Sequence, residues 1–190
     1  MSDSAKTQPM SAEQYLEWER LQTSKHEYHS GTVFAMAGGS PRHNFLAAAI
    51  TGELRSALSS SDCRVLSSDQ RISARRGERY VYPDAVVVCG RIELEASDVL
   101  SNPTVVVEVH SSSTEGYDRG GKWALYQALS SLTDYVLMSQ DALRIEHFRR
   151  KEDGGWHYEV VGAAQDLVLA NGARLSVDAI YRGAFELSAE

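Results

Sequence analysis

The stretch Thr104-Val105-Val106-Val107-Glu108-Val109 decides the fold. Its uninterrupted β-branched residues are typical of a strand in the middle of a sheet, with both faces covered. A carboxylate at the end of such a strand is unusual, because an isolated buried charge is costly unless it is paired or bound to a metal ion. The run therefore predicts a central strand, and Glu108 becomes a candidate functional residue at its end.

The sequence on both sides of this run predicts one domain in which helices and strands are mixed. The prediction rests on hydrophobic periodicity and on turn signals such as Asp153-Gly154-Gly155. A second central strand is predicted at 134–138, and 92–102 is predicted to be a loop. The other expected elements are a helix from Ser11, a hairpin at 26–36, a helix at 42–58, strands at 63–74 and 80–88, a helix within 113–131, a hairpin formed by 144–150 and 156–161, and a short closing helix at 176–181.

Length and composition fit a single α/β domain. The chain has 190 residues, of which 43% are hydrophobic and 24% are charged, a balance typical of a globular domain with one core. We expect residues 1–10 to form a disordered tail and residues 11–190 to form the domain. No apolar run is long enough to cross a bilayer, and no secretory signal is recognisable. Cys63 and Cys89 lack Cys-x-x-Cys spacing, so we expect a soluble cytoplasmic protein with reduced thiols.

The net charge of −7 argues against a surface devoted entirely to nucleic acid, because phosphate binding draws on clustered Lys and Arg. A local basic groove remains compatible with this charge. Two groups of basic residues could line one, although charge runs usually face water. They are Arg71, Arg75, Arg76 and Arg79, and Arg144, Arg149, Arg150 and Lys151.

Three polar positions interrupt the apolar patterns. Pro83-Asp84 breaks the strand at 80–88, where proline indicates a bend that can re-aim a side chain. Glu108 ends the central strand, and Lys122 lies early in the next helix. Two carboxylates at adjacent strand ends can hold a hard cation such as Mg²⁺, which activates water and neutralises a phosphate. Because a nearby lysine can stabilise the developing charge, this set predicts phosphodiester hydrolysis.

The same residues resemble the PD-(D/E)XK nuclease superfamily and, more closely, the Uma-two family of restriction endonucleases. The likeness extends over roughly 11–181. It implies a restriction-endonuclease-like core, in which a mixed central β-sheet is flanked by helices and extended by an N-terminal and a C-terminal hairpin. Four stretches carry it: His-Glu-Tyr-His-Ser-Gly at 26–31, Ala-Met-Ala-Gly-Gly-Ser-Pro-Arg-His-Asn at 35–44, Tyr-Pro-Asp-Ala-Val-Val-Val at 82–88, and Val-Glu-Val-His-Ser-Ser-Ser-Thr-Glu-Gly-Tyr-Asp-Arg-Gly-Gly-Lys at 107–122.

The resemblance implies specific roles. Asp84 and Glu108 correspond to metal ligands, and Val109 is taken as a third metal-binding position. The superfamily normally places its lysine two residues after the acid, on the same strand, but this sequence has His110 there. Lys122 matches a family pattern in which the lysine has moved to the following helix, so it is the expected catalytic lysine.

The remaining candidates each have a structural alternative. Glu27 matches the family's N-terminal acid and could either reach the metal or face solvent. His43 could act in the site or bond the backbone at its helix start, and His110 could be an auxiliary group or a filler. Asp118 could serve the site or simply cap its helix. Asp69, placed on a strand by the pattern, is a minor candidate.

Two functions are left open. The first is a Mg²⁺- or Mn²⁺-dependent endonuclease of restriction or repair type that acts on nucleic acid, most simply DNA, with no membrane partner. The second is a weakly active or inactive nuclease-fold module that binds nucleic acid or protein. A homodimer is compatible with the first, since cutting two strands needs two sites. Other enzyme classes lack support, because no Gly-x-Ser-x-Gly, Walker or dinucleotide-binding motif occurs.

Overall fold

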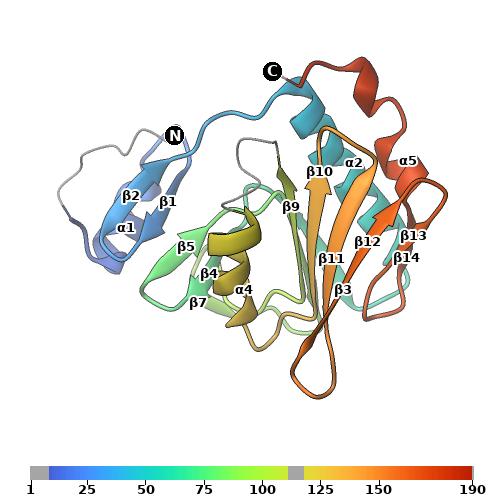
Figure 1. Ribbon diagram of the computed structural model, residues 1–190. Helices are drawn as coiled ribbons and strands as arrows, with labels where there is room; N and C mark the ends of the chain where they lie inside the picture. Colours follow the sequence, from blue (N-terminus) through green and yellow to red (C-terminus); the bar gives the residue numbers. More distant parts are fainter. Residues whose placement is uncertain (1–8, 111–117, 190) are drawn as a thin grey trace.

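The computed structural model describes residues 9–110 and 118–189, without the side chain of Asp118. This part of the chain contains two six-stranded sheets and one two-stranded sheet (Figure 1). Within the same residues, no helix is both long and apolar enough to span a membrane. The elements are α1 (Ala12–Glu19), β1 (His26–His29), β2 (Thr32–Ala35), α2 (Pro41–Ala57), β3 (Cys63–Ser67), β4 (Arg71–Arg75), β5 (Arg79–Val81), β6 (Ala85–Cys89), β7 (Leu94–Ala96), β8 (Val99–Leu100), β9 (Val105–His110), the π-helix η1 (Asp118–Lys122), α4 (Trp123–Gln127), β10 (Asp134–Ser139), β11 (Arg144–Arg150), β12 (Trp156–Gly162), β13 (Asp166–Val168), β14 (Arg174–Ser176), α5 (Val177–Tyr181) and the 3-10 helix η2 (Ala184–Glu186).

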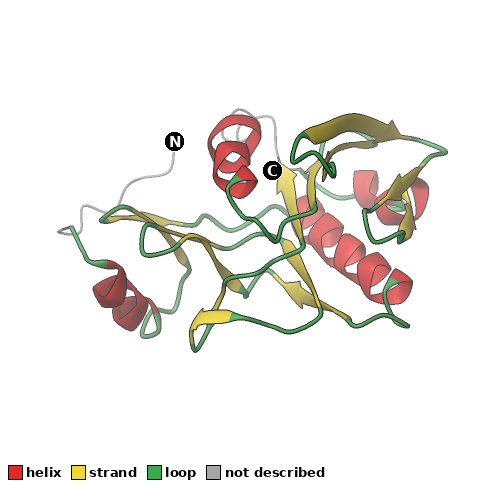
Figure 2. Ribbon diagram, turned by 90° about the horizontal axis from the view of Figure 1, so that it is seen from below, coloured by secondary structure: helices red, strands yellow, loops and turns green. Residues whose placement is uncertain are grey.

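The central sheet has the strand order β12-β11-β10-β9-β6-β3. Strands β9 and β10 run parallel, and the other neighbours in this sheet are antiparallel. Every residue of β9 and β10 is buried, because helices cover both faces of the sheet (Figure 2). This confirms the mixed central sheet and the two central strands that the sequence predicts.

Alternation along β9 divides its side chains between two cores. Val105, Val107 and Val109 pack with α2 on one face, and Val106 packs with α4 on the other. Glu108 shares the parity of Val106, so it lies on the α4 face. The carboxylate is therefore directed toward η1 and α4, the segment that carries Lys122.

The second sheet, ordered β2-β1-β5-β4-β8-β7, lies beside the central sheet and is packed by α1. Its small core is aromatic: the Tyr15 ring stacks 5.0 Å from Tyr28 and 5.7 Å from Tyr80, measured between ring centroids. The predicted hairpin at 26–36 is present as β1 and β2. Met10 is also held here, because its amide donates to the Gly31 carbonyl at 3.1 Å.

The chain passes from one sheet to the other where polar residues interrupt the apolar pattern of the sequence. The single strand expected at 80–88 is two strands, β5 and β6, which belong to different sheets and are separated by Pro83 and Asp84. Proline cannot donate to a β-ladder, so pairing stops there. The strand expected at 63–74 is likewise divided into β3 and β4 by a turn at Ser68 and Asp69.

Two other expectations from the sequence are wrong. Residues 92–102 are not a loop, because they contain β7 and the short β8, and β8 pairs in parallel with β4. The cysteines are not separate thiols: Cys63 and Cys89 form a disulfide with a Cα–Cα distance of 3.9 Å. The antiparallel register of β3 and β6 places these two residues directly opposite each other, and neither is fully buried.

The C-terminal part of the chain is anchored to the sheet by a buried polar network. Asp134 accepts hydrogen bonds from the Thr133 hydroxyl at 2.7 Å and from the Ala170 amide at 3.0 Å, and its Oδ1 bonds His147 Nε2 at 2.8 Å. His147 Nδ1 bonds Glu159 at 3.1 Å. Asp134 and His147 are fully buried, so one carboxylate joins β10, β11 and the segment after β13.

Candidate functional site

Glu108 lies near the end of β9 and is enclosed, with 4% of its surface exposed. The Tyr126 hydroxyl donates to its Oε1 at 2.7 Å, and the Lys122 ammonium lies 3.0 Å from its Oε2. Burial, reinforced by the charge of Glu108, raises the pKa of Tyr126 well above its ordinary value. Tyr126 therefore remains a hydrogen-bond donor to Glu108 at physiological pH.

Lys122 is directed into the protein, with only 9% of its surface exposed. It ends η1 and precedes α4, a position from which the side chain reaches Glu108 of the central sheet. Its ammonium also lies 3.9 Å from Oε1 of Glu27 on β1 of the second sheet. Lys122 thus connects acids from both sheets, and its side chain does not face solvent.

Asp84 lies in the break between β5 and β6 and is held by two groups. Its Oδ1 bonds Nε2 of His43 at 3.0 Å, and its Oδ2 accepts from the Val109 amide at 2.7 Å. His43 is positioned by the start of α2, where its amide donates to the Ser40 hydroxyl that caps the helix. The sequence candidates His43 and Val109 therefore both contact Asp84.

The two acids lie at the same end of neighbouring strands. Ala85 of β6 pairs with Val107 of the antiparallel β9. Asp84 precedes Ala85 and Glu108 follows Val107, so both acids lie toward the same end of this strand pair. Their oxygens are bonded to different protein groups, and no cluster of three or more His, Cys, Asp and Glu side chains suited to a metal ion occurs among the described residues. The arrangement is therefore two adjacent acid sites, linked through residues 108 and 109.

The lesser candidates, His110, Asp69 and Asp118, have different environments. His110 is 4% exposed, and neither ring nitrogen has a hydrogen-bond partner in the described part of the chain. Asp69 lies in a turn rather than on a strand; its side chain is 85% exposed and forms an ion pair with Lys25 at 2.8 Å. Asp118 begins η1, but its side chain lies outside the described residues.

One contact of the site, that of Tyr126, has no counterpart in the sequence predictions. The Tyr126 hydroxyl holds Glu108. Tyr126 follows Lys122 by four residues, and residues at this spacing lie on one face of a helix. A tyrosine one turn after the candidate lysine was thus the available signal.

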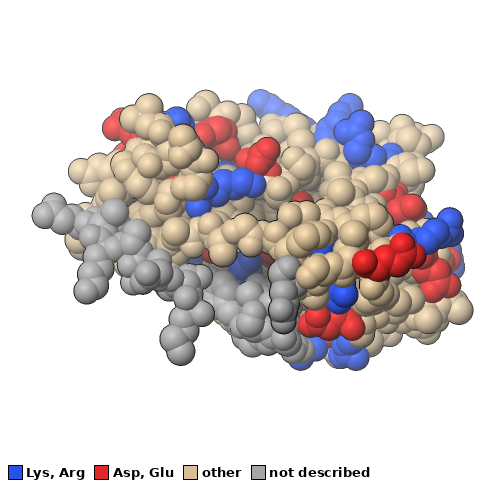
Figure 3. All heavy atoms as spheres, turned by 90° about the horizontal axis from the view of Figure 1, so that it is seen from above, with Lys and Arg blue, Asp and Glu red and all other residues tan. Residues whose placement is uncertain are grey.

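The two predicted basic groups are partly taken up by contacts within the protein. Arg71 is buried and donates to the Tyr82 hydroxyl. Arg150 donates to the carbonyl of Leu132 and stacks over Trp156. Seen from above, Lys and Arg side chains occur in separate groups among acids (Figure 3). Arg71 and Arg150 thus serve hydrogen bonds within the protein.

The fold, with acids and an inward lysine at one end of a mixed sheet, is that of a restriction-endonuclease-like nuclease domain. The sequence profile of the Uma2 family, described as "Putative restriction endonuclease", matches residues 12–190. The chain belongs to this family.

Two relatives and one solved structure are similar to this chain. The uncharacterized protein slr1290 of Synechocystis sp. is 37% identical over 183 residues, covering 96% of each chain. A second uncharacterized Synechocystis protein, sll1609, is 29% identical over 154 residues, covering 80% of this chain and 87% of its own. The crystal structure of a "putative nuclease belonging to DUF820" from Anabaena variabilis superposes with a TM-score of 0.71 at 15% identity, over 93% of this chain and 99% of that one.

Proposed function

We propose that this protein is a divalent-metal-dependent endonuclease that hydrolyses phosphodiester bonds in DNA, of restriction or repair type. The observation that carries the proposal is the enclosed pair of Glu108 and Lys122, with 3.0 Å between Oε2 and Nζ. A lysine ammonium and a carboxylate held in a nearly dry environment at a strand end are costly for folding alone. They are the groups that phosphodiester hydrolysis requires.

The residues present fit a hard divalent cation. Asp84, Glu108 and Glu27 carry three formal negative charges against the single positive charge of Lys122, and their oxygens are the donors that Mg²⁺ and Mn²⁺ prefer. The Val109 carbonyl supports the set, because N–H and C=O of one residue in an antiparallel pair point to the same neighbour and the Val109 amide bonds Asp84. A bound cation would neutralise phosphate charge and lower the pKa of water.

The protein groups have separable roles in this proposal. Lys122 orients the attacking water and stabilises negative charge that develops on the phosphate in the transition state. Tyr126 keeps the Glu108 carboxylate in one orientation through the 2.7 Å hydrogen bond. His43 does the same for Asp84 from the start of α2. Glu27 adds negative charge from the second sheet. The two sheets therefore have to pack correctly for the site to exist.

The proposed substrate is DNA, and on a duplex a homodimer would supply one site for each strand. Analytical ultracentrifugation of the pure protein with and without a short duplex tests this arrangement. A monomer in both conditions would restrict the proposal to single-strand cleavage.

The alternative function is a binding module that has kept the fold. Two observations favour it: His110 stands where the superfamily has lysine, and the oxygens of Asp84 and Glu108 already bond protein groups. Isothermal titration with Mn²⁺ separates the two functions. A binding module needs no carboxylate ion site, so absence of heat together with DNA binding would favour it.

Asp84→Ala is expected to abolish cleavage and to weaken Mn²⁺ binding, because it removes one proposed ligand. The measurement combines calorimetric Mn²⁺ titration with cleavage of supercoiled and single-stranded DNA in Mg²⁺ or Mn²⁺. Asp69→Ala is the matched control, since this acid is exposed and paired only with Lys25. Wild-type protein that binds Mn²⁺ but cuts neither DNA nor RNA would contradict the nuclease proposal.

His110→Ala is expected to slow cleavage less than Lys122→Ala does. In the described part of the chain the His110 ring nitrogens bond no group, so its removal disrupts no contact that holds the acids or Lys122. The comparison uses initial rates of the two variants on the same DNA substrate, with thermal unfolding as the control for folding. Equal losses would show that the catalytic lysine has been assigned to the wrong position.

A further inference from the structure

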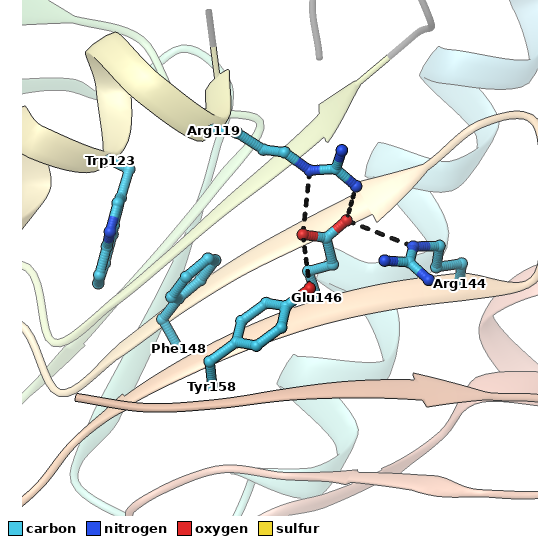
Figure 4. Close-up of a pocket in the computed structure, with 6 residues that line it drawn as sticks. All are labelled: Arg119, Trp123, Arg144, Glu146, Phe148 and Tyr158. Carbon is cyan, nitrogen blue, oxygen red and sulfur yellow. Dashed lines mark hydrogen bonds and ion pairs between the residues drawn. The ribbon is translucent and has the colours of Figure 1, made fainter. Parts of the chain in front are cut away.

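A hollow of about 450 Å³ lies on the α4 face of the central sheet, beside the acids and outside the proposed metal site. Side chains from η1, α4, β11 and β12 line it, and those of Arg119, Arg144 and Tyr158 point toward one carboxylate, that of Glu146 (Figure 4). Its six lining residues are Arg119, Trp123, Arg144, Glu146, Phe148 and Tyr158.

The Glu146 carboxylate organises this hollow, and hydrogen bonds from its neighbours occupy both of its oxygens. Its side chain is 3% exposed, and it accepts from Arg119 through two nitrogens, from Arg144 Nε at 3.3 Å and from the Tyr158 hydroxyl at 3.1 Å. Burial acts to raise the pKa of the Glu146 carboxyl, but the hydrogen bonds and charges of Arg119, Tyr158 and Arg144 outweigh it and lower the pKa. Glu146 therefore fixes its donors and offers no open acceptor to a ligand.

The charge and surface of the hollow favour an aromatic anion. Two guanidinium groups and one carboxylate give a formal charge of +1. Arg144 uses only Nε toward Glu146, and its terminal nitrogens bond no group in the described residues. Opposite the arginines, Phe148 lies between Trp123 and Tyr158, with centroid distances of 4.2 and 4.9 Å. Tyr158 is 48% exposed and presents a ring to which a base can stack.

Glu146, which organises the hollow, and Glu108 lie in register across neighbouring strands of the sheet. Leu137 of β10 pairs with Glu108 on one side and with Glu146 on the other. Paired residues project from the same face, so Glu146 and Glu108 are two strands apart, on the order of 10 Å. Arg119 also precedes Lys122 by three residues in η1. One nucleic-acid strand can therefore reach both places.

We propose that this hollow is a subsite for one nucleotide of an unpaired substrate strand, with the base against Tyr158 and Phe148 and a phosphate at Arg144 and Arg119. The inference rests on the proposed nuclease function and adds to it the class of nucleic acid engaged. An unpaired strand is required, because only a base outside the duplex stack exposes the face that an aromatic side chain can cover.

The test is binding without metal, so that cleavage plays no part. The probes are a fluorescent single-stranded oligodeoxynucleotide, its duplex and a single deoxynucleoside monophosphate, each titrated in EDTA. Anisotropy reports binding of the labelled strands. Intrinsic tryptophan fluorescence reports the hollow, because Trp123 lines it and a stacked base should quench the emission.

Tyr158→Ala is expected to weaken single-strand binding about fivefold to a hundredfold, the range for loss of one stacked base. Tyr158→Phe keeps the ring and should bind within a small factor of wild type. Arg144→Ala should weaken binding roughly tenfold, through the loss of a charged hydrogen bond. Arg174→Ala is its matched control, since Arg174 is an exposed arginine paired with Asp166 on the two-stranded sheet, and it should bind like wild type.

The outcomes separate this proposal from the nuclease proposal. Single-strand binding that both hollow variants weaken supports the subsite, even if wild-type protein cuts nothing when Mg²⁺ is added. DNA cleavage that persists while neither hollow variant changes binding overturns the subsite and leaves the nuclease in place. Quenching by the monophosphate without single-strand binding also overturns it, since the hollow would then serve a free nucleotide. Thermal unfolding confirms that each variant is folded.

Discussion

Lys122→Ala is expected to slow DNA cleavage by about 100- to 1,000-fold, the effect typical of removing one positioned charge that stabilises a transition state. The ammonium lies 3.0 Å from Glu108 and 3.9 Å from Glu27, so its removal leaves the proposed metal ligands unchanged in number. Mn²⁺ binding should therefore persist, or even strengthen, because a positive charge leaves an acidic site. Single-turnover cleavage and calorimetry on the same preparation measure the two effects.

The matched control for this prediction is Lys151→Ala. Lys151 also pairs with an acid, Asp153 at 3.3 Å, but this pair is exposed in the β11–β12 turn. The variant should cleave at the wild-type rate. Loss of Mn²⁺ binding together with cleavage in Lys122→Ala would indicate that the lysine supports the structure of the site, and its catalytic role would then be rejected.

Much of the fold could be predicted from the sequence because its strongest signals are local. The Val-rich strand β9 and the turn between β11 and β12 each depend on residues close together in the chain. Strands β7 and β8 could not be predicted in the same way. They are only three and two residues long, and β8 pairs both with β7 and with the distant β4. A disulfide between Cys63 and Cys89 depends similarly on the register of β3 and β6.

Residues of the candidate site could be predicted from the sequence, but the contacts between them could not. Glu108 and Lys122 stand out because charge interrupts an apolar strand and a helix. The bond from His43 to Asp84 joins the start of α2 to the β5–β6 break, and no periodicity in either segment indicates it. Asp69 resembled a site residue only while its segment was taken for a strand. Tertiary packing thus decided which polar residues meet.

The hollow around Glu146 shows the same limit for a possible binding surface. In the sequence, Arg144 belongs to a basic run that suggests a solvated hairpin face. In the fold, alternation along β11 places Glu146 and Phe148 on the α4 face, where Arg119 and Trp123 of another segment meet them. A strand's alternation can be read from its sequence, whereas the helix that covers the strand cannot.

Asp134→Ala is expected to lower the free energy of unfolding by about 3–5 kcal/mol, because buried groups lose their acceptor and each such loss costs about 1–3 kcal/mol. The carboxylate is fully buried and bonds His147, the Thr133 hydroxyl and the Ala170 amide. Its removal leaves each of these groups without that acceptor and leaves a cavity. Equilibrium urea unfolding, followed by circular dichroism, measures the change from the shift in midpoint.

Asp166→Ala is the control for this loss. Asp166 pairs with Arg174 at 3.1 Å on the nearby two-stranded sheet, but both side chains are well exposed. Exposed ion pairs contribute about 0–1 kcal/mol, so this variant should unfold close to wild type. Glu159→Gln should lie between the two, because it changes only the half-exposed partner of His147. If Asp134→Ala is no more destabilising than Asp166→Ala, the network around Asp134 does not anchor the segment after β13.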